Sequence, residues 1–188
     1  MKEPLPEILP ADPLPLVARW LEEATPVVKS ATATALATVA SDGRPTVRMV
    51  ICRGFDPVEG WFVFYTDRES VKGQALEQNP RAAVVFHWDV FERQIRVEGP
   101  VTRAPEADSE RYWSTRPLDA RIAAVKRTHG ADVPRPPRWG GYRIWAERVE
   151  LWVGQPGRAH DRAAWTRALE PTGAAFTGGS WRGTRLQP

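Results

Sequence analysis

The chain has 188 residues, with 26 Lys and Arg against 23 Asp and Glu, which gives a net charge of +3. Its 42% hydrophobic and 26% charged residues are typical of a globular protein, and the length predicts one domain spanning residues 1–188. No apolar run approaches the roughly 20 residues of a membrane-spanning helix. Acidic residues and five prolines within residues 1–15 do not resemble a signal peptide, so we expect a cytoplasmic protein without a membrane partner.

The cysteine content and the net charge argue against several classes of site. The single cysteine, Cys52, cannot form an internal disulfide, and no Cys/His spacing typical of zinc is present, so we expect no metal. Cys52 lies in an apolar segment, which favours a core thiol over a nucleophile. A surplus of three charges without a basic stripe also argues against a nucleic-acid partner.

Arginine and tryptophan are both abundant. Of the 26 basic residues 22 are Arg, which reflects either GC-rich coding or phosphate recognition. Most of the nine Trp residues are expected in the core or an interface, and one or two could stack on a flat cofactor.

The periodicity of apolar residues predicts a few short helices. After a proline-broken arm at residues 1–12, residues 13–25 have helical apolar spacing and Asp12 as a cap. Residues 70–79 and 105–124 also read as helical, the latter with a break at Pro117.

Most of the remaining chain alternates in the manner of strands. The predicted strands are residues 31–40, 45–53, 60–66, 81–88, 94–102, 142–153, 161–168 and 181–186. Asp42-Gly43 marks a hairpin turn, and residues 128–138 form a Pro/Gly-rich loop. This spacing predicts a mainly β (α+β) fold, a closed or nearly closed antiparallel barrel with peripheral helices. No dinucleotide-binding glycine motif or P-loop is present.

Two segments carry candidate anion sites. Arg48 lies in an otherwise apolar strand and has opposite parity to Arg53, so the two would face opposite sides of a regular strand. Arg48 either binds a phosphate at the barrel edge or lies on the exposed face. The sequence from Tyr65-Thr66 to Ser70 and Lys72 predicts strand, loop and helix start, which is a geometry that receives anions. Ser70 could equally be a plain N-cap.

Two further segments carry polar groups suited to a ring. Gln94 in a half-buried strand could hydrogen-bond a heterocycle edge, or simply water. Arg158, His160 and Arg162 share one face if a strand begins at Arg158, and they would repel one another without an anion or electron-rich ring. A chance cluster of surface charge is the alternative. Paired catalytic carboxylates and nucleophile triads are not evident.

Several motifs together resemble one family, the pyridoxamine/pyridoxine 5′-phosphate oxidases, over nearly the whole length. The motifs are Asp42-Gly43-Arg44-Pro45, Arg48-Met49-Val50-Ile51, Glu92-Arg93-Gln94, Trp139-Gly140-Gly141-Tyr142-Arg143, Arg158-Ala159-His160-Asp161-Arg162 and Arg185-Leu186-Gln187-Pro188. The resemblance implies an FMN-binding split barrel that works as a homodimer with FMN at the subunit interface. Residues 139–188 would complete the barrel and the dimer site.

The resemblance also implies a role for individual residues. FMN would contact Arg48, Met49, Val50, Ile51, Arg53, Tyr65, Thr66, Lys72, Gln94, Trp152 and Arg162, the last two from the partner subunit. Substrate would contact Arg53, Tyr112, Arg116, Arg158 and His160. Arg158 and His160 would be the catalytic pair that orients the substrate over the flavin.

The activity that the resemblance implies is oxidation of pyridoxine or pyridoxamine 5′-phosphate to pyridoxal 5′-phosphate. Hydride passes from substrate C4′ to flavin N5, and O₂ reoxidises the flavin with release of H₂O₂. The alternatives are a related FMN oxidase of another small aromatic metabolite, of the phenazine-pathway type, or a non-catalytic flavin-binding barrel.

The chain departs from the family pattern at several site positions. Val71 replaces a usual Arg, Arg53 replaces a frequent Lys, and Ala120-Arg121 replaces a usual Ser-Gln pair. The segment before Trp139 is also shorter than usual. With these departures, the resemblance supports FMN binding more strongly than it supports the vitamin substrate.

Overall fold

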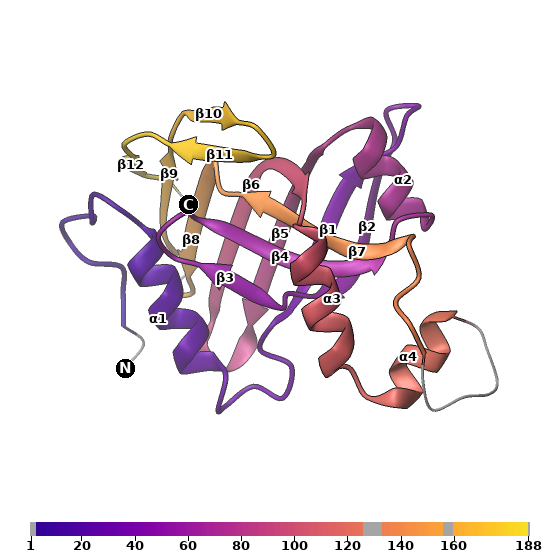
Figure 1. The fold of residues 1–188 in the computed structure, drawn as a ribbon. Coiled ribbons are helices and arrows are strands. Elements are labelled where there is room, and N and C mark those ends of the chain that lie inside the picture. The colour runs from indigo at the N-terminus through magenta and orange to yellow at the C-terminus, as the bar shows by residue number, and fades with distance from the viewer. Residues whose placement is uncertain (1–2, 126–132, 156–159, 188) are drawn as a thin grey trace.

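The computed structural model describes residues 3–125, 133–155 and 160–187 (Figure 1). The α-helices in these ranges are α1 (Leu14–Ala24), α2 (Val71–Gln78), α3 (Glu106–Thr115) and α4 (Leu118–Val125). The strands are β1 (Ala33–Val39), β2 (Pro45–Ile51), β3 (Gly54–Asp56), β4 (Trp61–Asp67), β5 (Arg81–Trp88), β6 (Arg93–Arg103), β7 (Trp139–Trp145), β8 (Arg148–Val153), β9 (Asp161–Thr166), β10 (Leu169–Thr172), β11 (Ala175–Gly178) and β12 (Arg182–Arg185). None of the helices in these ranges is long and apolar enough to cross a membrane.

The strands form a curled antiparallel half-barrel, which confirms the predicted β-rich class. The main path runs β12-β9-β8-β6-β5-β1-β2, so β2 lies at an edge, and β4 pairs with β3 and β7 away from this path. The first part of β6 pairs with β5 and β8, whereas its last residues, Val101 to Arg103, pair with β7. The long strand β6 therefore connects the two layers that enclose the core.

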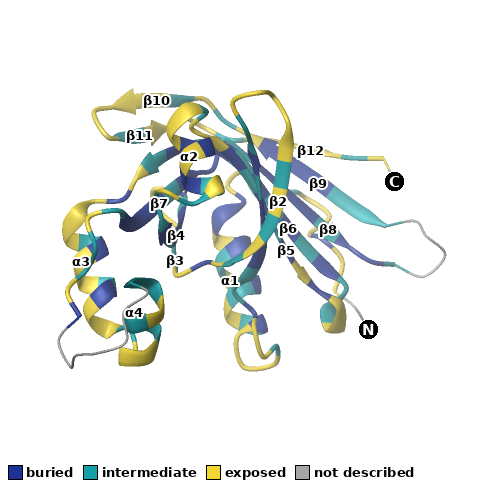
Figure 2. Cartoon of the chain, turned by 90° about the vertical axis from the view of Figure 1, so that its right-hand side faces the viewer, coloured by how far each residue is buried: buried dark blue, intermediate teal, exposed yellow. Residues whose placement is uncertain are grey.

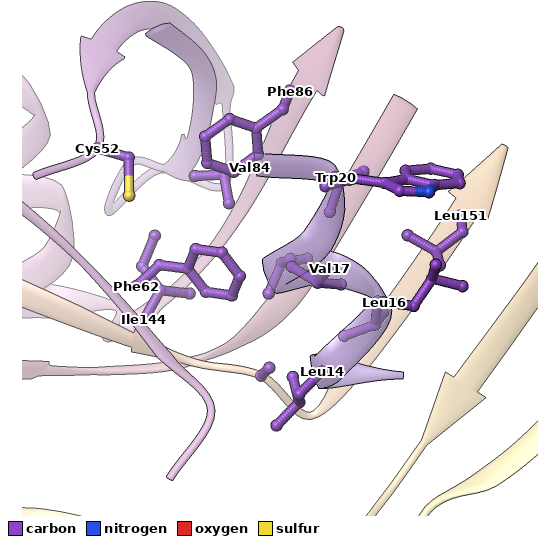
Figure 3. Close-up of a cluster of buried hydrophobic side chains, with 14 of the residues drawn as sticks. Leu14, Leu16, Val17, Trp20, Cys52, Phe62, Val84, Phe86, Ile144 and Leu151 are labelled. Atoms are coloured by element: carbon purple, nitrogen blue, oxygen red, sulfur yellow. The ribbon is translucent and has the colours of Figure 1, made fainter. Parts of the chain in front are cut away.

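Helix α1 closes the open side of this half-barrel. Its apolar residues Leu14, Val17 and Trp20 are at most 2% exposed and point toward strand residues such as Phe86 (Figure 3). The Asp12 carboxylate accepts a 2.8 Å hydrogen bond from the Leu14 N–H, which satisfies a free donor of the first turn. The predicted helix is confirmed, although Pro13 rather than Asp12 is the N-cap residue.

The N-terminal arm packs against the C-terminal strands. Leu5 is 3% exposed, and its N–H donates to the Asp161 carboxylate at 2.8 Å. The Trp165 indole donates to the Pro10 carbonyl at 2.8 Å. The two ends of the chain therefore stabilise each other, and the arm is part of the folded domain.

The predicted strand at 142–153 is wrong, since two strands with a bend at Ala146 occupy it. The Ala146 N–H donates to the Gly60 carbonyl instead of a neighbour in the main sheet, so the chain crosses there from one layer to the other. The Trp145 carbonyl lies so close to Gly99 that an added Cβ would come within 1.8 Å of it. Most residues of both strands are buried, so the long apolar content on either side of Glu147-Arg148 resembles one strand.

Other departures involve exposed or undescribed segments. The β10–β11 hairpin was not predicted, because its mostly exposed polar residues do not alternate. Short β3 was also missed. The predicted helix break at Pro117 is confirmed between α3 and α4. Most of the loop predicted from residue 128 lies outside the described residues.

Cys52 is a core thiol, as predicted. It is 7% exposed, its Sγ donates to the Gly54 carbonyl at 3.3 Å, and burial raises the pKa of the thiol to about 11. At pH 8 about one thiol in a thousand is ionised, and the thiolate is the reactive form. We expect an aromatic disulfide reagent at pH 8 to label folded protein much more slowly than guanidinium-unfolded protein. Equal labelling rates would contradict this assignment.

Candidate functional site

A cavity of about 310 Å³ lies where edge strand β2 meets β4 and helices α2, α3 and α4. Its lining residues are Met49, Val50, Ile51, Arg53, Tyr65, Lys72, Tyr112, Arg116, Pro117 and Ala120. All of them except Pro117 and Ala120 are residues that the sequence assigned to cofactor or substrate. The fold therefore brings predicted residues from separate segments into one hollow.

The cavity has three cationic side chains without acidic partners. Arg53, Lys72 and Arg116 approach it from different elements, and within the described ranges no carboxylate oxygen lies within 4 Å of their charged groups. Lys72 Nζ donates only to the Ser70 hydroxyl at 3.2 Å. The Arg116 guanidinium donates to the Ala120 carbonyl at 2.9 Å, whereas its buried Nε has no hydrogen-bond partner among the described residues. Cations left uncompensated in a hollow are suited to binding anions.

Arg48 does not line the cavity, but it lies near enough to Lys72 for its charge to act on that side chain. Its guanidinium donates to the Leu36 carbonyl at 3.2 Å and to the hydroxyls of Thr38 and Thr46 at 2.8 and 2.5 Å. Burial lowers the pKa of Arg48, and burial together with the Arg48 charge lowers the pKa of Lys72. Two mutually repelling cations held by neutral groups form a fitting cradle for a phosphate.

The first turn of α2 carries Lys72, one of the two cations of this cradle. Ser70 is the N-cap, and its hydroxyl accepts from the Gly73 N–H at 3.4 Å. The helix dipole at this end favours an anion. The N-cap reading of Ser70 and the anion-site reading of the segment are therefore compatible.

We expected Arg48 and Arg53 to face opposite sides because a regular strand was predicted to include both residues. Strand β2 ends at Ile51, and the Arg53 N–H instead bonds the Val63 carbonyl at 2.7 Å. Alternation therefore does not extend to Arg53. The bend allows Arg53 to line the cavity next to residues of both faces of β2.

An aromatic wall supports the cavity. The ring centroid of Tyr65 lies 4.3 Å from that of Tyr112 and 5.5 Å from that of Trp139, with near-parallel planes. Arg53 lies over Tyr112 at 5.6 Å, and Arg116 lies over Trp139 at 5.0 Å. The wall fixes the two guanidinium groups through cation–π contacts. Trp139 was predicted as a motif residue without a site role, and its place here depends on the pairing of β4 with β7.

Thr66 does not join the cavity lining. It follows Tyr65 on β4, is 8% exposed, and so directs its side chain to the opposite, buried face.

A second group of predicted residues forms a row across three strands. Gln94 on β6 pairs with Trp152 on β8, which pairs with Arg162 on β9, so all three side chains lie on one face. The His160 ring lies 4.9 Å from that of Trp152, and its Nδ1 accepts from the Gln155 N–H at 3.3 Å. A neutral imidazole with an acceptor at Nδ1 carries its proton on Nε2.

Arg158 lies outside the described residues. Strand β9 begins at Asp161, so His160 precedes it, and the predicted shared face of Arg158, His160 and Arg162 remains a prediction. The proximity of His160 to this row comes from its ring contact with Trp152 instead.

The cavity lies beside edge strand β2, whereas the row crosses β6, β8 and β9 of the same sheet. Five strand-to-strand steps separate β2 from β9 in the order β2-β1-β5-β6-β8-β9. At about 4.8 Å a step, the distance along the sheet is roughly 24 Å.

Comparisons with known proteins identify the family of the chain. Residues 21–153 match the family described as pyridoxamine 5′-phosphate oxidase, and residues 139–188 match the pyridoxine 5′-phosphate oxidase C-terminal dimerisation region. The chain is 40% identical over 200 residues to the pyridoxine/pyridoxamine 5′-phosphate oxidase of Rubrobacter xylanophilus, covering 94% of this chain and 87% of that protein. It is 39% identical over 203 residues to the enzyme of the same name from Gluconobacter oxydans, covering 96% of each.

Solved structures show the same fold. PhzG from Burkholderia lata, in complex with tetrahydrophenazine-1-carboxylic acid, has a TM-score of 0.82 and 28% identity, covering 95% of this chain and 94% of that one. An FMN-binding protein from Nostoc punctiforme related to pyridoxamine 5′-phosphate oxidase has a TM-score of 0.74 at 19% identity, covering 97% and 99%, which shows a shared fold. The family match over most of the chain, together with these relatives, establishes that the protein belongs to the pyridoxamine 5′-phosphate oxidase family of oxidoreductases.

Proposed function

We propose that the protein is an FMN-dependent oxidase that converts pyridoxine or pyridoxamine 5′-phosphate to pyridoxal 5′-phosphate, with O₂ as acceptor and H₂O₂ as product. The observation that carries this proposal is the cavity in which Arg53, Lys72 and Arg116 meet without an acidic partner in the described ranges. Arg48 lies near Lys72, so the cations form two sets: Arg48 with Lys72, and Arg53 with Arg116. Two sets suit two phosphates, one on the cofactor and one on the substrate.

The donor set fits FMN on one side of the cavity. Arg48 and Lys72 would hold the phosphate, and residues 49–51 of the edge strand would line the flavin. The bound flavin supplies the acceptor for a hydride, a chemistry that no protein side chain provides. The protein contributes charge, orientation and exclusion of water.

The donor set fits the substrate phosphate on the other side. In the described part of the chain Arg116 has a buried Nε without a hydrogen-bond partner, and both Arg116 and Arg53 lie over rings of the aromatic wall. Tyr112 lines the cavity between them and offers a hydroxyl donor. These three residues would anchor the phosphate end, so that the reacting carbon is held at a fixed distance from it.

The site is completed by a second copy of the chain. The match of residues 139–188 to a dimerisation region supports a homodimer. The cavity edge carries exposed apolar side chains, since Val47 is 70% and Met49 64% exposed along β2 (Figure 2). A homodimer would bring Trp152 and Arg162 of the partner subunit to the flavin, and Arg158 and His160 of the partner subunit to the substrate. The separation of these residues from β2 along the sheet supports a contribution in trans.

A second candidate is an FMN oxidase of another small aromatic metabolite. The structural likeness to PhzG favours it, as does Ala120, which places a methyl group in the cavity where the family usually has a hydroxyl. Such a substrate would use Arg53 and Arg116 for a carboxylate instead of a phosphate.

Anaerobic addition of pyridoxine 5′-phosphate to the FMN-loaded protein tests the proposal. We expect the visible flavin absorption band to bleach and to return when air is admitted, with one H₂O₂ formed per flavin. A flavin that bleaches only with a dihydrophenazine carboxylate would favour the second candidate. Bound flavin that bleaches with neither would indicate a non-catalytic flavin-binding barrel.

A further inference from the structure

Glu150 is a buried carboxylate enclosed by arginines on the outer face of the sheet. It is 6% exposed on β8. Its Oε1 accepts from Arg162 Nη2 at 2.8 Å and its Oε2 accepts from Arg148 Nη2 at 3.4 Å, while Arg96 Nη2 forms an ion pair with Oε2 at 2.7 Å. The carboxylate therefore contacts three guanidinium groups, which come from three strands.

The cluster keeps this carboxylate ionised. Burial alone would raise the pKa of Glu150, but the hydrogen bonds and charges of the arginines outweigh burial and lower the pKa below its usual value. Glu98 is the second acid of the cluster and reaches Arg96 at 2.9 Å and Arg148 at 3.9 Å. Glu98 has no contact with Arg162, so Glu150 alone connects this cluster to that residue in the described ranges.

The Arg162 guanidinium is held from two sides. Glu150 holds Nη2, and the Gln187 carbonyl near the C-terminus accepts from Nη1 at 3.3 Å. These two bonds use two of the five N–H donors, and no other acceptor within the described ranges takes the remaining three. An arginine already fixed in this way loses less rotamer freedom when it binds.

We propose that Glu150 is a positioning residue that orients Arg162 for its contact with the flavin of the partner subunit. The inference rests on the proposed function, which assigns Arg162 to the flavin. The register supports it, because Glu150 and Trp152 lie two residues apart on one face of β8, and Arg162 lies directly beside Trp152. The carboxylate thus fixes the end of the row that faces the ligand.

The test compares FMN dissociation constants of the Glu150→Gln and Glu98→Gln dimers, measured by quenching of flavin fluorescence. Loss of a buried charge-assisted hydrogen bond is expected to weaken FMN binding about tenfold in Glu150→Gln. Glu98→Gln removes an acid from the same cluster without touching Arg162, so its FMN affinity should match the unmodified protein. Glu150→Asp, which keeps the charge, serves as a second variant if Glu150→Gln does not fold, and it should bind FMN more weakly than Glu98→Gln.

Arg162→Ala separates positioning from a general structural role. If Glu150 acts through Arg162, Glu150→Gln has no further effect on FMN affinity in the Arg162→Ala background. Equal losses in both backgrounds, or native affinity in Glu150→Gln, would overturn the inference while the flavin contact of Arg162 stands. Native FMN affinity in Arg162→Ala itself would instead refute the flavin contact in the proposed function.

Discussion

Replacement of His160 with alanine is expected to lower kcat on pyridoxine 5′-phosphate about a hundredfold, since misplacement of a reacting group by 1 Å costs about that much. The FMN dissociation constant should stay within about twofold, because His160 is assigned to the substrate. His160 is suited to orienting a substrate because the Gln155 N–H fixes its tautomer and leaves Nε2–H as a donor. Stopped-flow reduction of the bound flavin measures this step directly.

A glutamine at the same position is the matched control. Its amide N–H₂ can stand in for the Nε2–H donor, whereas alanine offers none. His160→Gln should therefore recover part of the rate of flavin reduction that His160→Ala loses. Full turnover in His160→Ala would remove this residue from the substrate site, and a large loss of FMN from the same variant would assign it to the cofactor instead.

Local sequence signals were sufficient for the elements that form the cavity. The hairpin around Asp42-Gly43 predicts strand β2, and the helix break at Pro117 places the end of α3 beside Ala120. Arginine within an apolar strand is also a local signal, because a charge there needs a partner or a ligand. This signal predicts Arg48, and the strand, loop and helix start from Tyr65 to Lys72 predicts Lys72, while their mutual proximity is seen only in the fold.

Features that depend on strand register could not be predicted in this way. Nothing near Gln94 in the chain indicates that Trp152 and Arg162 lie in its row, since the row requires the order of β6, β8 and β9. Glu150 was missed for the same reason, because an acid in an alternating strand looks solvated until its three arginine neighbours are placed around it. The resemblance to a family supplied roles for residues of the row, whereas only the fold shows what holds them.

Replacement of Arg48 with alanine is expected to weaken FMN binding by about a hundredfold, the upper range for loss of a charge-assisted hydrogen bond to a phosphate. We expect this effect because the hydrogen-bond partners of Arg48 among the described residues are neutral hydroxyl and carbonyl groups. Its positive charge is therefore available to a phosphate. Fluorescence titration of the apoprotein with FMN measures the loss. Riboflavin, which lacks the phosphate, should bind both proteins with the same affinity.

Two further variants distinguish a phosphate contact from damage to the hairpin. Arg44→Ala removes an exposed arginine of the same hairpin that pairs with Asp42, and its FMN affinity should be unchanged. Arg48→Lys keeps the charge but not the planar fork, so its affinity should lie between those of Arg48→Ala and the unmodified protein. An equal loss of riboflavin and FMN in Arg48→Ala would contradict a phosphate contact, because the deficit would then not depend on the phosphate.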